Sequence, residues 1–334
     1  MSDIQTDQLP TSDSARGVFP KALCAEDARA LSAIQNWRGA LAILFQWSVI
    51  ATAAFAAIWS EYWLVYALAV VVIGTRQHAL AILVHDAAHH RLFTGRAFND
   101  VAANLTLAYP LGFSLTRYRP FHLDHHRFSY SDCRKDPEWR YIQNNPDWQW
   151  PKSPRAAGRI ILMDLLGLNI LSLWRLLRQF SPWFIFLHTQ AVDGESLRTG
   201  ERALLLGFAG TVLAALALTN GWAYFALLWL LPMATIATAV FRLRTVAEHA
   251  GLTEEHELRS TRTVLPAVFE RFLVAPCNVN YHLEHHLYPS VPFYNLPKLH
   301  RRLLAEPEFR RNAHISRMYT DLKGGVIREV TQRD

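Results

Sequence analysis

The chain has 334 residues, of which 51% are hydrophobic, and its formal net charge is +6. Three scattered cysteines without a C-x-x-C pair argue against a disulfide framework and against a thiolate metal site. The positive charge comes without a Gly-rich phosphate loop, an RNA-binding aromatic pattern or zinc-finger spacing, so we expect no nucleic-acid partner. The apolar residues gather in a few long runs, which is typical of a membrane protein.

The chain divides into three predicted regions. Residues 1–38 begin with a polar stretch that lacks the basic start and apolar core of a signal peptide, and we expect a cytoplasmic N-terminal tail. Residues 39–310 contain the long apolar runs and are predicted to form one membrane domain. Residues 311–334 are predicted to be a basic C-terminal tail.

Four apolar runs come close to the ~20 residues that a helix needs to cross a bilayer. The first two extend from about Ala40 to Trp59 and from about Tyr62 to Val84. The other two extend from about Ala203 to Leu218 and from about Trp222 to Val240, on either side of an Asn-Gly turn. The sequence therefore predicts an all-α protein with four transmembrane helices in two hairpins. A soluble protein with buried helices is the alternative.

Two further apolar segments are expected to lie in the membrane interface without crossing it. The segment from about Ile160 to Leu177 is interrupted by Asp164 and Arg175, and the segment from Val101 to Leu115 is too short to span. Lys and Arg mark the cytoplasmic side of a membrane protein, and both hairpin tips lack them. We therefore expect both termini, the central segment and the active site to be cytoplasmic.

Eight of the fifteen histidines form three compact groups on this predicted cytoplasmic side. Residues three or four apart share a face of a helix, so the outer histidines of each group can converge on one metal ion. In each H-x-x-H-H group the inner histidine lies about 100° around the helix from its neighbour and can reach a second ion. The groups are His85 and His89 in HDAAHH, His122, His125 and His126 in HLDHH, and His282, His285 and His286 in HLEHH.

Eight imidazoles are too many for a single ion. Structural zinc sites usually close with four ligands, whereas two iron ions with open positions for dioxygen fit the number of histidines. His85 can pair with His89 or with His90, and helical geometry favours His89. Asp86, Asp124 and Glu284 lie inside the groups, where a carboxylate can orient a ligating imidazole. Solvated acids at helix ends are an equally good interpretation of these three residues.

At these residues the chain resembles the membrane fatty acid desaturase superfamily. The histidine boxes of that superfamily are H-x3-4-H, H-x2-3-H-H, and a third box of the same form that begins with His or Gln. The resemblance runs from the first apolar run to about Leu304 and includes Asn278 to Tyr281 before the third box and Leu287 to Pro289 after it. It implies a desaturase-like domain over residues 39–310, with a cytoplasmic helical cap that holds two nonhaem iron ions.

The resemblance also implies an additional histidine ligand after the fourth span. His249 in RTVAEHAG, beside Glu248, is the candidate. Some relatives use an asparagine for a water-mediated iron contact, but Thr245 stands four residues before His249, and Asn278 is a weak substitute. The sequence shows no cytochrome b5 module and no iron–sulfur pattern, so the electrons must come from a separate ferredoxin, rubredoxin or cytochrome b5 with its reductase.

These observations together predict an O2-dependent di-iron oxidoreductase, a desaturase that introduces a double bond into a fatty acyl or lipid chain. The alternative within the superfamily is a hydroxylase or ketolase acting on a carotenoid, a lipid or a small amphipathic metabolite. A metal transporter is disfavoured because the spans carry almost no ionisable residues apart from Arg76 and His78 near the cytoplasmic end. A zinc-dependent lipid hydrolase is a further alternative, and the identity of the bound metal would distinguish it from a di-iron oxidoreductase.

Overall fold

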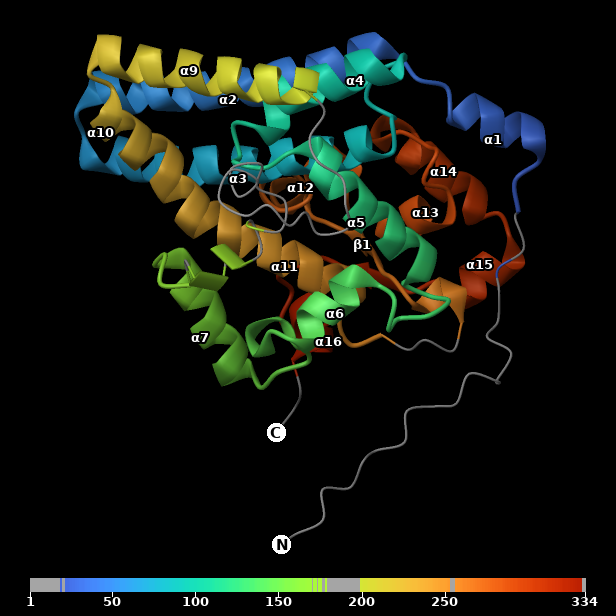
Figure 1. Cartoon of the computed structure of the whole chain (residues 1–334). Helices are drawn as coiled ribbons and strands as arrows, with labels where there is room; N and C mark the ends of the chain where they lie inside the picture. Colours follow the sequence, from blue (N-terminus) through green and yellow to red (C-terminus); the bar gives the residue numbers. More distant parts are fainter. Residues whose placement is uncertain are drawn as a thin grey trace, which may run out of the picture.

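The computed structural model describes residues 19, 22–169, 171, 172, 174, 175, 178, 199–252 and 256–331. Parts of the predicted N-terminal tail (residues 1–18, 20 and 21) lie outside the described residues, as do four positions of the predicted interfacial segment (170, 173, 176 and 177) and residues 332–334. Figure 1 shows long helices along one end of the molecule and shorter helices at the other.

Within the described residues, four helices are long and apolar enough to cross a membrane, which confirms the four predicted runs. They cover Ala25–Ser60, Trp63–Ala88, Gly200–Thr219 and Trp222–His249. The first consists of the short helix α1 and the long helix α2, and the last is a continuous series of α-helical and π-helical segments. The elements are α1 (Ala25–Leu31), α2 (Asn36–Ser60), α3 (Trp63–Ala88), α9 (Thr199–Thr219), α10 (Trp222–Phe225), η5 (Ala226–Leu230), η6 (Met233–Ala237) and α11 (Thr238–His249).

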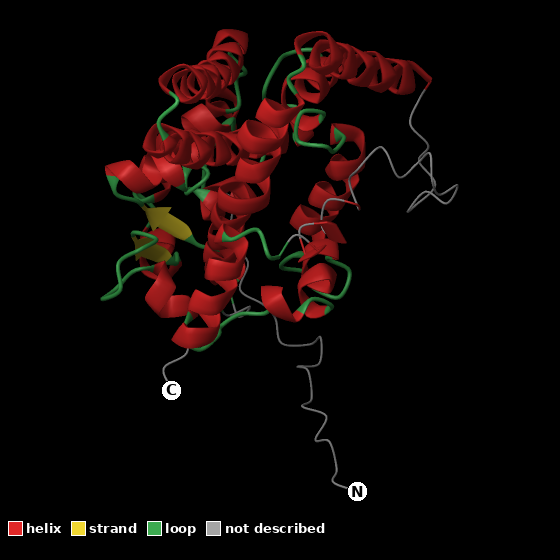
Figure 2. Ribbon diagram, turned by 90° about the vertical axis from the view of Figure 1, so that its left-hand side faces the viewer, coloured by secondary structure: helices red, strands yellow, loops and turns green. Residues whose placement is uncertain are grey.

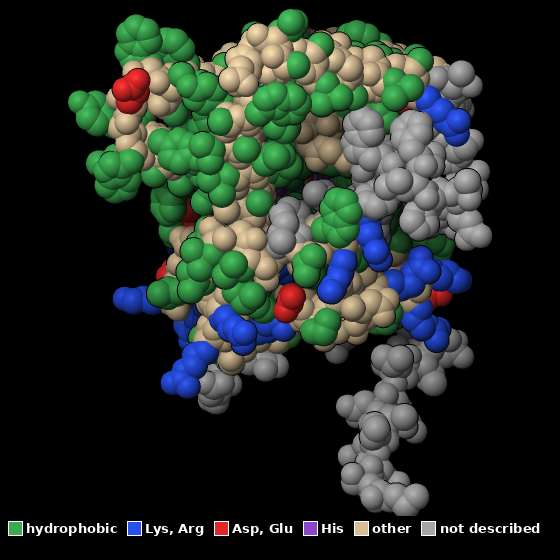
Figure 3. Space-filling model, turned by 60° about the vertical axis from the view of Figure 1, so that its left-hand side comes forward, with side chains coloured by type: hydrophobic (Ala, Val, Ile, Leu, Met, Phe, Trp, Pro, Cys, Tyr) green, Lys and Arg blue, Asp and Glu red, His purple; other side chains and the backbone are tan. Residues whose placement is uncertain are grey.

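The long helices differ in what surrounds them. α2 and α9 expose large apolar side chains, with 79% of Trp59 and 88% of Leu218 accessible, whereas α3 is buried along almost its entire second half. Gly74 allows this close packing, because a Cβ atom there would lie 2.6 Å from the Cβ atom of Ile236. In Figure 3 hydrophobic side chains cover the upper part of the visible face, and most Lys and Arg side chains lie in its lower part.

Shorter helices connect the second and third long helices. The region from Val101 to Leu115, predicted to lie in the membrane interface, instead packs inside the protein, with Leu107, Leu111 and Leu115 buried in the same core as α3. Asp164, which interrupts the later apolar segment, is buried and accepts hydrogen bonds from Arg242. These elements are α4 (Arg96–Ala103), η1 (Asn104–Ala108), α5 (Leu115–Phe128), α6 (Pro137–Gln143), η2 (Pro146–Trp148) and α7 (Pro154–Leu165).

The segment after α11 forms small helices and one pair of strands. The protein is mostly helical, but β1 and β2 form a two-stranded parallel sheet (Figure 2) that the all-α prediction did not include. Three-residue strands carry too little pattern to be recognised in the sequence. The elements are η7 (Glu257–Arg259), β1 (Thr263–Leu265), α12 (Val268–Leu273), η8 (Pro276–Asn278), α13 (His282–Leu287), η9 (Phe293–Asn295), α14 (Leu296–Leu303), α15 (Pro307–Asn312), β2 (Ile315–Arg317) and α16 (Val326–Val330).

Residues 311–331 pack against the rest of the domain. Tyr319, Val326 and Val330 are buried in one apolar cluster with Val246 and Ala247 of α11. The region predicted as a basic tail therefore contributes a strand and a helix to the folded protein. The predicted boundaries at residues 38 and 310 stay a prediction.

Candidate metal centre

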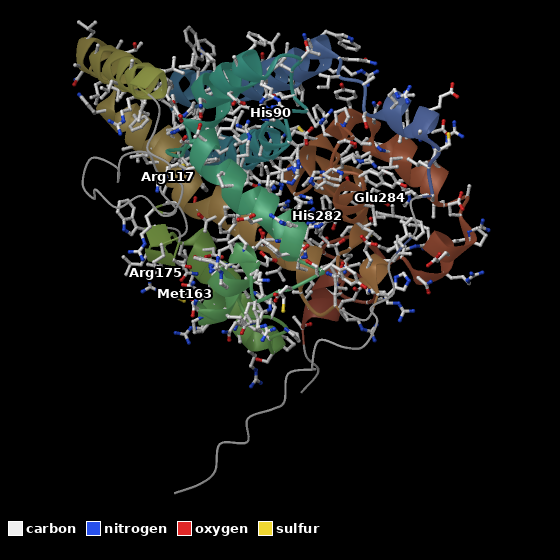
Figure 4. All side chains as sticks on the ribbon, turned by 45° about the vertical axis from the view of Figure 1, so that its right-hand side comes forward. His90, Arg117, Met163, Arg175, His282 and Glu284 are labelled. Atoms are coloured by element: carbon white, nitrogen blue, oxygen red, sulfur yellow. The ribbon has the colours of Figure 1, made fainter. Side chains whose placement is uncertain are left out.

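Nine histidine side chains from four helices meet in the interior of the protein. α3 and α11 each end at the site, and α5 and α13 carry the H-x-x-H-H motifs past it. In Figure 4 His282 is labelled beside α5. The nine are His85 and His89 at the end of α3, His122, His125 and His126 on α5, His249 at the end of α11, and His282, His285 and His286 on α13.

The donor nitrogens form two groups, and within each group they all lie within 4.8 Å of one another. α5 and α13 each supply both groups, because the inner histidine of each motif projects about 100° away from its neighbour. Group one contains His85, His89, His122, His126 and His285, and group two contains His125, His249, His282 and His286.

The distances within each group fit a bound metal ion. The Nε2 atoms of His89 and His122 are 2.8 Å apart, and those of His126 and His285 are 3.0 Å apart. In group two, the Nε2 atoms of His249 and His282 are 3.0 Å apart. Two imidazole nitrogens that bind one metal at about 2.1 Å and at right angles are separated by about 3.0 Å. The spacing is therefore that of neighbouring ligands on one ion.

Unpaired nitrogens support the same conclusion. Among the described residues, Nε2 of His85 and Nε2 of His125 are buried and have no hydrogen-bond partner. In addition, Nε2 of His122 has two other Nε2 atoms near it, at 2.8 and 3.1 Å. A neutral imidazole has only one N–H, so hydrogen bonds cannot satisfy all of these contacts. A metal ion in each group would satisfy all these nitrogens at once.

The protonation of five of the rings also suits metal binding. Burial lowers the pKa of His89 to about 3 and lowers the pKa of His122 and His285 well below its ordinary value. The pKa values of His282 and His286 are lowered for the same reason. These rings are therefore neutral at physiological pH, and a neutral imidazole has the free lone pair that a metal requires.

Carboxylates contact the outer nitrogens of group two. Nδ1 of His125 lies 3.0 Å from the carboxylate of Asp136, whose other oxygen accepts a hydrogen bond from the backbone N–H of Glu138 at the start of α6. Burial alone would lower the pKa of His125, but Glu138 and Asp136 raise it to about 9. Nδ1 of His282 lies 3.3 Å from the carboxylate of Glu248. Such contacts fix ring orientation and increase the basicity of a ligand.

Group one has weaker carboxylate contacts of this kind. Nδ1 of His85 lies 3.8 Å from Asp86, which accepts a hydrogen bond from the backbone N–H of Phe293. Tyr118 stacks on the ring of His122, with centroids 5.3 Å apart and planes 10° apart. Group one is therefore oriented mainly by packing.

Three residues predicted to support the metal ligands lie elsewhere. Asp124 is exposed, and within the described part of the chain its carboxylate makes no hydrogen bond to a histidine. Glu284 is buried and contacts Nδ1 of His300 and the hydroxyl of Thr263, so it fixes α13 from the side away from the groups. Asn278 donates to the carbonyl of Phe293.

The two adjacent histidines at the end of α3, of which helical geometry favoured His89, are placed differently. His89 belongs to group one, whereas His90 lies outside both groups (Figure 4), with Nδ1 3.5 Å from Asp100.

The contacts of Asp136 and Glu138 with His125 were not predicted. The Asp-Pro-Glu sequence that starts α6 is a helix N-terminal pattern and was the only local indication of an ordered carboxylate there.

A mostly apolar cavity of about 120 Å³ adjoins group one. It lies between α3, α5 and the η6–α11 segment, and its walls include Phe113, Met233 and Phe241. His85 and Tyr118 form the wall nearest to the histidines. A larger cavity of about 680 Å³ between α7, α11 and α16 touches none of the nine histidines. Of these two cavities, the one of about 120 Å³ therefore places an apolar ligand beside the site.

Comparisons with known proteins agree with this site. The family model described as fatty acid desaturase matches residues 61–317. Dihydrorhizobitoxine desaturase from Bradyrhizobium elkanii is 28% identical over 83% of this chain and 78% of its own length. The human sphingolipid delta(4)-desaturase/C4-monooxygenase DES2 is 29% identical over 67% of this chain, which spans 61% of that protein. The bovine form is 27% identical over the same shares.

The matched residues contain all nine histidines, the four helix ends that carry them, and the walls of the smaller cavity. The relatives are named as desaturases, and one name also includes a monooxygenase activity. Both activities are oxidations, so the chain is an oxidoreductase. Its four apolar helices suit an integral membrane protein. The chain belongs to the fatty acid desaturase family.

Proposed function

We propose that the chain is an O2-dependent di-iron membrane desaturase that introduces a double bond into an acyl or other lipid-type chain. The observation that carries the proposal is the pair of histidine groups beside an apolar cavity. Five histidines would hold one iron ion and four would hold the other. Two irons in these groups would supply the dioxygen activation that removal of hydrogen from an unactivated C–H bond requires.

The residues of this chain have separate parts in that reaction. The histidines hold the metal ions, and Asp136 and Glu248 orient the rings of His125 and His282. The cavity walls exclude water and align one carbon pair of the substrate next to His85 and Tyr118. Because the cavity ends at group one, we expect the oxidised carbons to lie on that side of the centre.

The size of the cavity limits which part of a substrate it encloses. An apolar cavity of about 150 Å³ holds one benzene molecule, so a volume of about 120 Å³ surrounds a short apolar segment. A longer substrate would extend beyond it. The names of the relatives support desaturation as the first candidate reaction. Hydroxylation is the second candidate, because the printed name of one relative includes C4-monooxygenase.

We further propose that the four long helices cross the bilayer as two hairpins, with the histidine groups and both termini on the cytoplasmic side. The turns at Glu61 and Asn220 carry no Lys or Arg, whereas these residues are frequent around the short helices. In this arrangement a ferredoxin, rubredoxin or cytochrome b5 with its reductase would deliver electrons from the cytoplasm.

The experiment is to express the chain with a reductase and electron carrier in a host and to compare its lipids and small metabolites by mass spectrometry. Desaturation predicts products that have lost two hydrogens and that disappear in His285→Ala. The exposed Asp124→Asn variant is the matched control and should retain them. Products that have gained one oxygen atom would instead support hydroxylation. An unchanged profile with His285→Ala would remove the catalytic assignment of the site.

A further inference from the structure

Two arginine–carboxylate pairs bind the ends of the two helices that enter the metal centre. α3 ends at Ala88, between His85 and His89, and α11 ends at His249. At the end of each helix the last carbonyl groups have no partner within the helix, and a cation there is favoured by the helix dipole. In both cases the cation is an arginine from another part of the chain.

Arg119 of α5 binds the end of α3. Its Nε donates to the carbonyl of Ala88 at 2.9 Å, and its Nη2 donates to the carbonyl of Ala87 at 3.1 Å. Asp100 of α4 accepts from both terminal nitrogens, at 3.0 and 2.5 Å. Partial burial would raise the pKa of Asp100, but the bonds from Arg119 hold it below its ordinary value, so the carboxylate is charged. This pair adjoins the group-one histidines.

Arg262 binds the end of α11 in the same way. Its Nη1 donates to the carbonyl of Ala247 at 2.5 Å, its Nη2 to that of Ala250 at 3.1 Å, and its backbone N–H to that of Glu248 at 3.0 Å. The side chain is fully buried and its Nε lies 3.1 Å from the carboxylate of Glu329 in α16. These contacts surround Glu248 and His249, the two residues of α11 at group two.

The two pairs act through the backbone, which distinguishes them from the carboxylates that contact the histidine rings. A helix end held by two hydrogen bonds, as in α3, or by three, as in α11, has little freedom to rotate, and a ligand on its last turn is held with it. Removing the carboxylate leaves the fully buried Arg262, or the largely buried Arg119, without its counter-charge, which is unfavourable. We expect the arginine then to turn toward water and release the helix end.

We propose that Arg119 with Asp100 positions group one, and that Arg262 with Glu329 positions group two, each independently of the other. Both are positioning pairs and touch neither metal nor substrate. The inference rests on the proposed metal centre. The helix α16, which lies far from every histidine motif in the sequence, would then help to position the metal site.

The test is to count the metal ions bound per purified chain, summing iron, zinc and manganese. The wild type should hold two. Glu329→Gln and Asp100→Asn should each hold one, and the variant with both changes should hold close to none. Glu308→Gln and Asp132→Asn, which remove partly exposed carboxylates from ion pairs that contact neither helix end, are the matched controls and should hold two.

Histidine variants identify the group that is lost. Adding His286→Ala of group two to Glu329→Gln should cause no further loss, whereas adding His89→Ala of group one should remove the second ion. Asp100→Asn should show the reverse pattern. Residues that act on one site give such non-additive effects.

The outcomes separate this inference from the function. Two ions retained in Glu329→Gln, or both lost from it alone, would overturn independent positioning. A wild type with two ions of zinc and no iron would contradict the di-iron proposal and leave the positioning test intact. A wild type without any metal would overturn both.

Discussion

The two histidine groups are held in different ways. Group one lies at the end of α3, whose second half is buried, and most of its contacts come from the packing of α3 against α5 and the core. Group two has charged contacts on its rings as well, with Asp136 at His125 and Glu248 at His282. Both groups have an arginine at the end of a helix that enters the site, so the groups differ in their ring contacts, which are mainly packing in group one and carboxylates in group two.

The difference has a physical reason. The second half of α3 is buried in the apolar core, so apolar contacts define the position of His85. The end of α11 is also buried, but it carries the charged side chains Arg244 and Glu248. Group two should therefore respond more strongly to the loss of a carboxylate that contacts a ligand ring.

The largest expected effect is the loss of a metal ligand from either group. His285→Ala in group one and His286→Ala in group two should each reduce product formation by more than the roughly 100-fold typical for an outer partner of a ligand. The proposed di-iron reaction needs both ions, so the two groups should not differ in this measurement. Activity retained in only one of the two variants would show that the groups have unequal roles.

The second largest effect is expected in group two alone. Asp136→Asn and Glu248→Gln should each lower metal affinity in group two by about 10- to 100-fold and leave group one filled. Metal titration of the stripped protein, followed by absorption or Mössbauer spectroscopy, measures this. Asp124→Asn should bind metal like the wild type because its side chain is exposed. An equal loss from both groups would contradict the comparison.

A smaller effect is expected from the cavity, which borders group one alone. Ala81→Phe places a large ring among its lining residues. Overpacking of this kind costs about 1–2 kcal/mol, so substrate binding should weaken roughly 5- to 30-fold. Both metal ions should remain bound. The measurement is the concentration dependence of product formation, and an unchanged dependence would place the substrate elsewhere.

The smallest effect concerns the two adjacent histidines at the end of α3. His89→Ala should remove the group-one ion. His90→Ala should leave the metal count unchanged, because it deletes only a partly exposed contact with Asp100, worth at most about 1 kcal/mol. The number of metal ions bound to each purified variant tests both expectations. Loss of an ion from His90→Ala would show that the ligand at this position had been misassigned.

Much of the architecture could be predicted because it depends on local patterns. The four long helices follow from uninterrupted apolar runs, and the boxes on α5 and α13 follow from spacings that place histidines on one helical face. The predicted interfacial segment from Val101 to Leu115 was wrong in its location, since a short apolar segment fits a lipid surface and a protein core equally well. Composition cannot distinguish these two environments.

The sequence alone singled out the histidines of the three boxes, because histidine spacing is a property of a single helix. Only the tertiary structure decided how they combine. It placed His89 and not His90 in group one, set Asp136 and not Asp124 against His125, and brought Glu329 beside Arg262, 67 positions away. Helical periodicity relates residues within a few turns, whereas contacts between distant segments depend on how the whole chain packs.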